Sequence, residues 1–343
     1  MSEIERKPRG AHLVGSVPLG SPEEVFRTTS AILGPRLARV SDGETGDRTR
    51  WIHWQSSVFA SHPAFEPAPA ADGYSAGASV RLRSGAAPSN LSFGPLGYAE
   101  VARASWATLE RLERAGEVSP LLRFQVSLPT ALAPVVWFVH SNDHAAVEAA
   151  YEAAMIAEAR AIAAAVPPAR LAIQWDVAVE VALLEGLRTP HFADVEAGIV
   201  ERLVRLGRAI PEGVELGYHL CYGDADHKHF KEPDDLSKLV RLANAIASRL
   251  ARPLDWVHVP VPRSRTDAAY FAPLAELRLP RTARLYLGLV HRTDGASGAW
   301  RRICAAREFV TDFGVGTECG LGRRLPETIP DLLKLHAEIA DPA

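Results

Sequence analysis

Short, nearly continuous apolar runs alternate with helix-forming stretches along the whole chain. Such runs are typical of strands that are covered on both faces in a parallel sheet. Eight of them occur, at residues 12–16, 38–42, 124–128, 171–176, 214–219, 256–261, 285–290 and 313–317. The clearest helical stretch is rich in Ala and Glu, has Asp143 at its start and stops at Pro167. The pattern therefore predicts strands and helices in alternation.

Eight strands in this alternation predict an α/β fold of the (β/α)8 or TIM barrel type. A doubly wound sheet is the alternative, but it needs fewer strands and carries a glycine-rich phosphate loop after the first one. Here the first run gives HLVGSVP, with a single glycine, and the G-x-G in FGVGTECG lies in the last strand. We therefore predict one barrel domain over residues 1–343.

One segment fits neither the strand nor the helix pattern. Residues 60–97 are rich in Pro, Gly, Ala and Ser, and they fall between the second and third predicted strands. We predict a long excursion from the barrel there, with a hairpin at ASVRLR (78–83). Long loops in compact domains are either functional lids or disordered segments, and both interpretations remain open for this one.

Polar and metal-binding residue types follow the predicted strands. The carboxyl ends of barrel strands meet at one rim, which is where active sites of this fold lie. In chain order the strand ends carry Gly15 and Ser16, Asp42 to Glu44, Thr130, Asp176, His219 with Cys221, His258, His291, and Glu318 with Cys319. Chance placement would rarely bring so many such residues to one rim, so the pattern predicts a functional site.

The histidine and cysteines at this rim suggest a metal. His219 and Cys221 end one strand and Cys319 follows another, so one imidazole and two thiols are expected close together. Zinc favours this donor set. The alternative is that both cysteines are small buried hydrophobic residues and His219 is a hydrogen-bonded core residue. A second cysteine at a matching strand end favours the zinc interpretation.

Six motifs now resemble, in order and spacing, the catalytic barrel of cobalamin-independent methionine synthases. They are HLVGSVP, SDGETGDR, LPT, IQWD, YHLCYGD and TECGLGRR, and the resemblance covers about residues 11–325. That family belongs to a superfamily with uroporphyrinogen decarboxylase and epoxyalkane:coenzyme M transferase. The resemblance implies a zinc-dependent transferase that moves an alkyl group, methyl in the family, to or from a small thiol.

The resemblance also implies roles for individual residues. It implies Zn²⁺ as the cofactor, with His219, Cys221 and Cys319 as ligands. The family's fourth ligand, a glutamate, is expected near Pro260, in DWVHVPVPRSR, and proline has no ligating side chain. His258, Glu318 or a group of the substrate are the candidates for that position.

The substrate and catalytic residues are implied in the same way. The implied substrate-binding residues are Gly15, Ser16, Glu44, Thr130 and Asp176. The carboxylates of Glu44 and Asp176 would face a substrate ammonium. Their alternative role is to cap the helices that follow them. The family's catalytic Asp-x-His is reshuffled here to His291-Arg292-Thr293-Asp294, so His291 and Asp294 are the catalytic candidates.

Two other functions remain open on the same residues. In a zinc-dependent lyase or hydrolase, the metal or the rim histidines would polarise an oxygen while Glu44 or Asp176 moves a proton. A non-catalytic zinc- or ligand-binding homologue is favoured by the altered ligand set. A Schiff-base aldolase is disfavoured, because no lysine falls at a strand end.

Charge and cysteine usage narrow the partners. The net charge of −3 over 343 residues gives no basic field for nucleic acid. No run reaches the ~18 apolar residues that span a bilayer, so we expect no membrane segment. Three cysteines are too few for a disulfide framework and predict a reduced, cytoplasmic protein. The expected partners are a small-molecule thiol and an alkyl donor, and a corrinoid protein remains open as the carrier of the alkyl group.

Overall fold

A curled parallel sheet of seven strands forms the centre of the computed structural model, which describes residues 6–68, 79–224 and 228–343. The strand order is β1-β4-β5-β6-β7-β8-β9, and each neighbouring pair is parallel. The strands are β1 (Arg39–Ser41), β4 (Arg123–Pro129), β5 (Leu171–Val177), β6 (Glu215–Leu220), β7 (Trp256–Pro260), β8 (Arg284–Gly288) and β9 (Gly314–Val315). Each strand extends at most one residue outside a predicted run, so seven of the eight predicted strands are confirmed.

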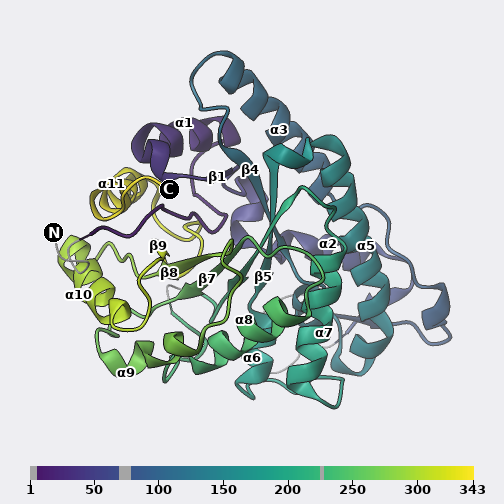
Figure 1. The fold of residues 1–343 in the computed structure, drawn as a ribbon. Coiled ribbons are helices and arrows are strands. Elements are labelled where there is room, and N and C mark those ends of the chain that lie inside the picture. Colours follow the sequence, from purple (N-terminus) through teal and green to yellow (C-terminus); the bar gives the residue numbers. More distant parts are fainter. Residues whose placement is uncertain (1–5, 69–78, 225–227) are drawn as a thin grey trace.

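Helices flank the sheet along its length (Figure 1). They are α1 (Pro22–Leu33), α2 (Ser56–Ser61), α3 (Tyr98–Arg114), α4 (Leu132–Phe138), α5 (His144–Ala165), α6 (Val179–Leu184), α7 (Val195–Arg208), α8 (Ser237–Arg249), α9 (Ala268–Phe271), α10 (Gly295–Arg307) and α11 (Ile329–Ile339). Local sequence sets their ends. Ser21 accepts a hydrogen bond from the Glu24 amide to begin α1, and α5 ends two residues before Pro167.

The predicted first strand at residues 12–16 forms isolated bridges in place of a ladder. Ala11 bridges Val315 on one side and Leu37 on the other, and Ser16 bridges Gly43. Between these points the Leu13 and Val14 carbonyl oxygens accept hydrogen bonds from glutamine side chains. Gln125 Nε2 lies 2.9 Å and 3.0 Å from them, and Gln174 Nε2 lies 2.7 Å from the Val14 oxygen. The segment therefore runs between β9 and β1 with isolated bridges on both sides and no continuous ladder, and a complete eight-stranded barrel stays a prediction.

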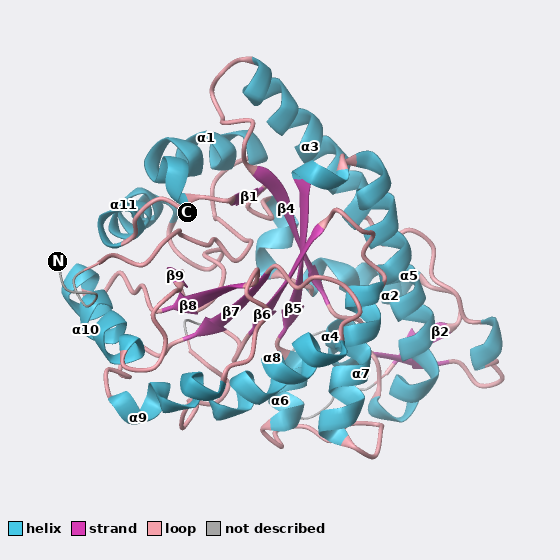
Figure 2. Ribbon diagram, in the orientation of Figure 1, coloured by secondary structure: helices cyan, strands magenta, loops and turns pink. Residues whose placement is uncertain are grey.

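The predicted excursion lies at one side of the molecule. Its two short strands, β2 (Phe65–Pro67) and β3 (Val80–Leu82), pair antiparallel and stand apart from the main sheet (Figure 2). The predicted hairpin at 78–83 thus contributes one strand, while residues 69–78 lie outside the described part of the chain. The Leu82 amide donates to Asp143 Oδ2 at 2.9 Å, which ties the excursion to the start of α5.

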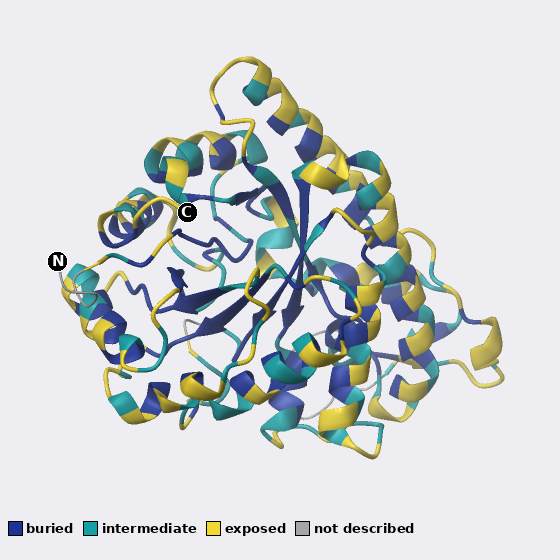
Figure 3. Cartoon of the chain, viewed as in Figure 1, coloured by how far each residue is buried: buried dark blue, intermediate teal, exposed yellow. Residues whose placement is uncertain are grey.

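Burial divides the molecule as the apolar pattern requires. Figure 3 shows buried strands and helices that are exposed on their outward faces. At the amino ends of the strands the indole of Trp256 fills the space that Gly217 leaves open, since a Cβ at position 217 would collide with the ring. The Arg39 guanidinium lies 3.9 Å from the centre of the same ring. In the described part of the chain no helix has the length and apolar character that a membrane crossing requires.

Candidate active site

The three predicted metal ligands meet at the carboxyl ends of β6 and β9. One donor atom from each of His219, Cys221 and Cys319 lies within 4.8 Å of the other two, and the two sulfur atoms are 3.7 Å apart. Among the described residues this group has no fourth His, Cys, Asp or Glu. The remaining cysteine, Cys304, is exposed on α10 and belongs to no such group in the described chain.

The donor set of this group fits a zinc ion. Nε2 of His219 is buried and has no hydrogen-bond partner among the described residues, so its lone pair is available to a metal. Burial, and then the neighbouring His258, hold the pKa of His219 well below its usual range, which keeps the imidazole in the neutral form that ligates metals. The Gly223 amide donates to Cys221 Sγ at 3.2 Å, a contact that stabilises a thiolate.

The candidates for a fourth ligand lie elsewhere. Pro260 ends β7, and its carbonyl oxygen accepts a hydrogen bond from the Tyr270 hydroxyl at 3.3 Å. His258 Nδ1 lies 2.8 Å from His219 Nδ1, so this nitrogen is engaged by the neighbouring ring. Three protein ligands with one open position are typical of catalytic zinc sites, whereas structural sites are closed by four.

Glu318, directly before Cys319, joins two histidines at the rim. Its carboxyl oxygens lie 3.3 Å from His291 Nδ1 and 3.4 Å from His229 Nε2. His291 Nε2 is 2.9 Å from the Val261 carbonyl oxygen and therefore carries its ring hydrogen, which leaves a lone pair on Nδ1. Burial raises the pKa of Glu318 to about 8, so this carboxyl keeps a proton at neutral pH and can donate it to His291.

The second predicted catalytic residue, Asp294, faces a different partner. Its two oxygens pair with the two terminal nitrogens of Arg302 at 2.8 Å and 2.9 Å. Arg302 is fully buried and also donates to the carbonyl oxygens of Leu289 and Arg263. The ion pair fixes the start of α10, and a catalytic role for Asp294 stays a prediction.

Glu44 is held against Gly15 by an unusual turn. Glu44 has a φ of 46°, and its amide donates to Asp42 Oδ1 at 2.9 Å. Asp42 is itself fixed by Arg48 at 2.8 Å and by the Ser105 hydroxyl at 2.7 Å. The turn brings Glu44 Oε1 so close to Gly15 that a Cβ at position 15 would collide with it.

The half-buried Glu44 and the buried Asp176 form a pair of carboxyl groups. Burial, and then the charge of Asp176, raise the pKa of Glu44 well above its usual range. Burial raises the pKa of Asp176 to about 7, although Gln174 Nε2 donates to it at 2.9 Å. Two such carboxyl groups repel each other when both are ionised, and a cation placed between them relieves the repulsion. The pair is therefore suited to bind an ammonium group.

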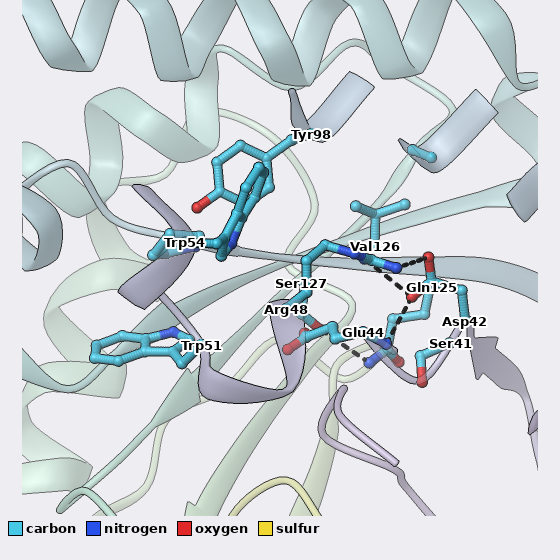
Figure 4. Close-up of a pocket in the computed structure, with 12 residues that line it drawn as sticks. Ser41, Asp42, Glu44, Arg48, Trp51, Trp54, Tyr98, Gln125, Val126 and Ser127 are labelled. Atoms are coloured by element: carbon cyan, nitrogen blue, oxygen red, sulfur yellow. Dashed lines mark hydrogen bonds and ion pairs between the residues drawn. The ribbon is translucent and has the colours of Figure 1, made fainter. Parts of the chain in front are cut away.

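A small cavity of about 20 Å³ opens beside Glu44 (Figure 4). Asp42, Glu44 and Gln125 gather on one side of it, and the aromatic rings of Trp51, Trp54 and Tyr98 on the other. The carboxyl and aromatic walls give this part of the site one polar and one apolar face.

Ser16 connects the carboxylate side of the site with the cysteine side. Its carbonyl oxygen accepts from the Leu321 amide at 2.7 Å, and its hydroxyl accepts from the Gly322 amide at 3.2 Å. Gly320 allows this approach, because a Cβ there would collide with the Ser16 hydroxyl. The turn that follows Cys319 thus packs directly on Ser16, as the shared rim predicted.

Thr130 is buried after β4 and lies beside Glu180 of α6, a carboxyl group that sequence reasoning missed. Burial raises the pKa of Glu180 to about 7, and the contact with Thr130 opposes this shift. Four carboxyl groups with raised pKa values therefore line this end of the sheet, namely the buried Asp176 and Glu180 and the half-buried Glu44 and Glu318.

We expect Glu180→Gln to flatten the pH dependence of stability. A carboxyl whose pKa is higher in the folded than in the unfolded chain stabilises the fold at low pH, and this contribution is lost as the pH rises through the folded-state pKa. With that pKa at about 7 against an ordinary 4.5, the variant should be more stable than wild type at pH 8 by about 3 kcal/mol.

Urea unfolding at pH 5 and pH 8 measures this difference in the free energy of unfolding. Glu100→Gln, at an exposed position of α3, is the matched control and should leave the pH dependence of wild type unchanged. Equal pH dependences for wild type and Glu180→Gln would contradict the prediction.

Comparison with known proteins places the fold. No protein-family model and no curated protein sequence matches this chain. A protein from Listeria monocytogenes described as a vitamin-B12 independent methionine synthase superimposes with a TM-score of 0.59 at 14% identity, over 98% of this chain and 99% of its own. A B12-independent methionine synthase from Shewanella sp. W3-18-1, in complex with selenomethionine, gives 0.61 at 14% identity, over 97% and 98%. The chain shares the fold of these proteins over nearly its whole length.

Proposed function

We propose that this protein is a zinc-dependent methyltransferase acting on a small thiol that carries an amino group. One observation carries the proposal: the donor atoms of His219, Cys221 and Cys319 lie within 4.8 Å of one another at the rim that also holds Glu44 and Asp176. The motif resemblance and the fold shared with methionine synthases support it. A closed (β/α)8 barrel over residues 1–343, with residues 12–16 as its first strand, is part of the same proposal.

Each part of the site then has a task. His219, Cys221 and Cys319 would hold the zinc, and a bound zinc would supply the positive charge that favours the deprotonated form of a substrate thiol at neutral pH. Glu44 and Asp176 bind the substrate ammonium. Gly15 and Ser16 supply the backbone that lies next to the substrate. Pro260 has no ligating side chain, so the thiol itself would supply a further donor. A reduced, cytoplasmic environment keeps both cysteines available as ligands.

His291, which follows β8, is the residue that handles the proton in this proposal. His291 offers a lone pair toward Glu318, and burial lowers the pKa of His291 to about 3, so the ring is neutral at pH 7. A neutral imidazole beside a protonated carboxyl is able to hold or release one proton at the rim. The alkyl donor is a second small molecule or a corrinoid protein.

A direct assay tests the proposed function. Zinc-loaded protein is incubated with homocysteine or other small thiols and with methyltetrahydrofolate or methylcobalamin, and the thioether product is measured by mass spectrometry. We expect methylation of an amino-acid thiol by wild type and none by Cys319→Ser. Zinc binding without alkylation of any thiol would contradict the proposal.

Pro260→Glu addresses the open position. Side chains alternate along a strand, so residue 260 faces the interior like His258, one step nearer to the rim. The added carboxylate supplies a fourth donor, and we expect the zinc dissociation constant to fall by about tenfold or more. Competition with a chromophoric chelator measures it. Unchanged affinity would show that position 260 does not face the metal.

A further inference from the structure

His258 is buried beside the predicted ligand His219, and the proposed function gives it no task. The two residues are register partners on the neighbouring strands β6 and β7, and both rings are almost fully buried. Their Nδ1 atoms lie 2.8 Å apart. A hydrogen bond between two neutral imidazoles needs one N–H donor and one lone pair, so only two arrangements of the hydrogens are open to the pair.

The two arrangements have opposite consequences for a metal. When His258 donates, its hydrogen occupies the lone pair of His219 Nδ1, and the His219 hydrogen must lie on Nε2. When His219 donates from Nδ1, its Nε2 keeps a free lone pair. Nε2 is the buried nitrogen of His219 that lacks a protein partner among the described residues, so only the second arrangement leaves a ligand atom.

Ligation of a metal by His219 Nε2 requires the second arrangement, in which His258 Nδ1 is the acceptor. Nε2 of His258 then carries the hydrogen; it is buried without a hydrogen-bond partner among the described residues, and the Thr317 backbone near the ring favours a hydrogen there. Gly288 leaves the space for this approach, since a Cβ there would lie 2.6 Å from the Thr317 carbonyl oxygen and 3.1 Å from His258 Nε2. A hydrogen held on His258 Nε2 leaves Nδ1 of the same ring as an acceptor.

We propose that His258 is a positioning residue that fixes the Nδ1–H tautomer of His219 and so presents His219 Nε2 to the metal. Thr317 completes the connection, because its hydroxyl donates to the Cys319 carbonyl oxygen at 2.7 Å. His258 thereby connects the strand that carries His219 with the segment that carries Thr317 and Cys319. As a neutral acceptor, His258 orients the ligand without adding negative charge to the site. This inference rests on the zinc site of the proposed function.

Two measurements test the role of His258. In metal-free wild type labelled with ¹⁵N-histidine, two-bond ¹H–¹⁵N correlations report the tautomer of His219, and we expect hydrogen on Nδ1. Chelator competition then gives zinc affinities for variants. His258→Leu removes the acceptor and should weaken zinc binding by about 10–100-fold. His258→Asn keeps an acceptor oxygen near the position of Nδ1 and should stay within about threefold of wild type.

His62→Leu, in the excursion, is the control for loss of a histidine and should bind zinc as wild type does. An Nε2–H tautomer of His219 in wild type, or wild-type affinity in His258→Leu, would overturn the inference while leaving the zinc site intact. Absence of zinc from wild type would instead contradict the proposed function. The NMR measurement of the His219 tautomer would then be the test of whether His258 fixes that tautomer. The same spectrum decides the question if the leucine variant does not fold.

Discussion

A Cys319→Ser variant should be purified almost without zinc, where wild type carries about one ion per chain. Serine has a similar shape, but its hydroxyl stays protonated at neutral pH and is a poor partner for zinc. Only His219 and Cys221 remain as strong donors, so we expect the affinity for zinc to fall by more than about 100-fold. Metal analysis after dialysis, together with chelator competition, measures the loss.

Cys304→Ser is the matched control for this variant. Cys304 is exposed on α10, whereas Cys319 Sγ lies 3.7 Å from Cys221 Sγ, so the control changes a thiol without touching the ligand group. It should retain its full zinc content. A Cys319→Ser protein with wild-type zinc would show that the ligand assignment is wrong, and the motif resemblance would then extend to the fold but not to the metal.

Gly15→Ala should lower kcat/KM for an amino-acid thiol by about 100-fold, because it disturbs Glu44. The added methyl group collides with Glu44 Oε1 and comes within 3.0 Å of the Ser127 hydroxyl. Glu44 must turn away, because its own backbone is fixed by the Asp42 side chain. A misplacement of this kind costs about 100-fold in kcat/KM, while the fold should lose only about 1–3 kcal/mol.

The control for Gly15→Ala is Gly94→Ala, whose added methyl group would meet no atom within 4 Å. Alkylation kinetics and urea unfolding separate the two effects. The defect of Gly15→Ala should shrink for a thiol acceptor that lacks the amino group, because such an acceptor makes no use of Glu44. Wild-type kcat/KM with an amino-acid thiol would refute the role of Gly15.

The strands were predictable because burial on both faces imposes a local signal. β5 is buried at every position, and its apolar run is visible in the chain. Residues 12–16 carry the same signal, yet their carbonyl groups bond to Gln125 and Gln174, which are more than 100 residues away in sequence. Competition from distant side chains leaves no trace in a local pattern, and this is why the predicted first strand forms isolated bridges in place of a ladder.

The site, like the fold, was predictable where the signal is local in sequence and not where it depends on distant contacts. Its residue types at strand ends were visible in the sequence, and their meeting at one rim follows from parallel strands. Their partners were not visible. Arg302, which engages Asp294, lies on a helix, and His229, which faces Glu318, lies in a loop; nothing in the sequence pairs either residue with its carboxyl group. The contact of His258 with His219 needed the strand register, which a single sequence does not specify.

The indole of Trp256 fills the sheet interior near the amino ends of the strands, where Gly217 makes room for it and Arg39 lies against the ring. In the proposed reaction the reactants would then enter and leave at the carboxyl ends of the strands. Two molecules that share a single mouth cannot pass each other, so the one that lies deeper has to arrive first and depart last. A catalyst built on this floor would therefore follow a compulsory order of addition, and its rate law would carry the signature of a sequential ternary complex.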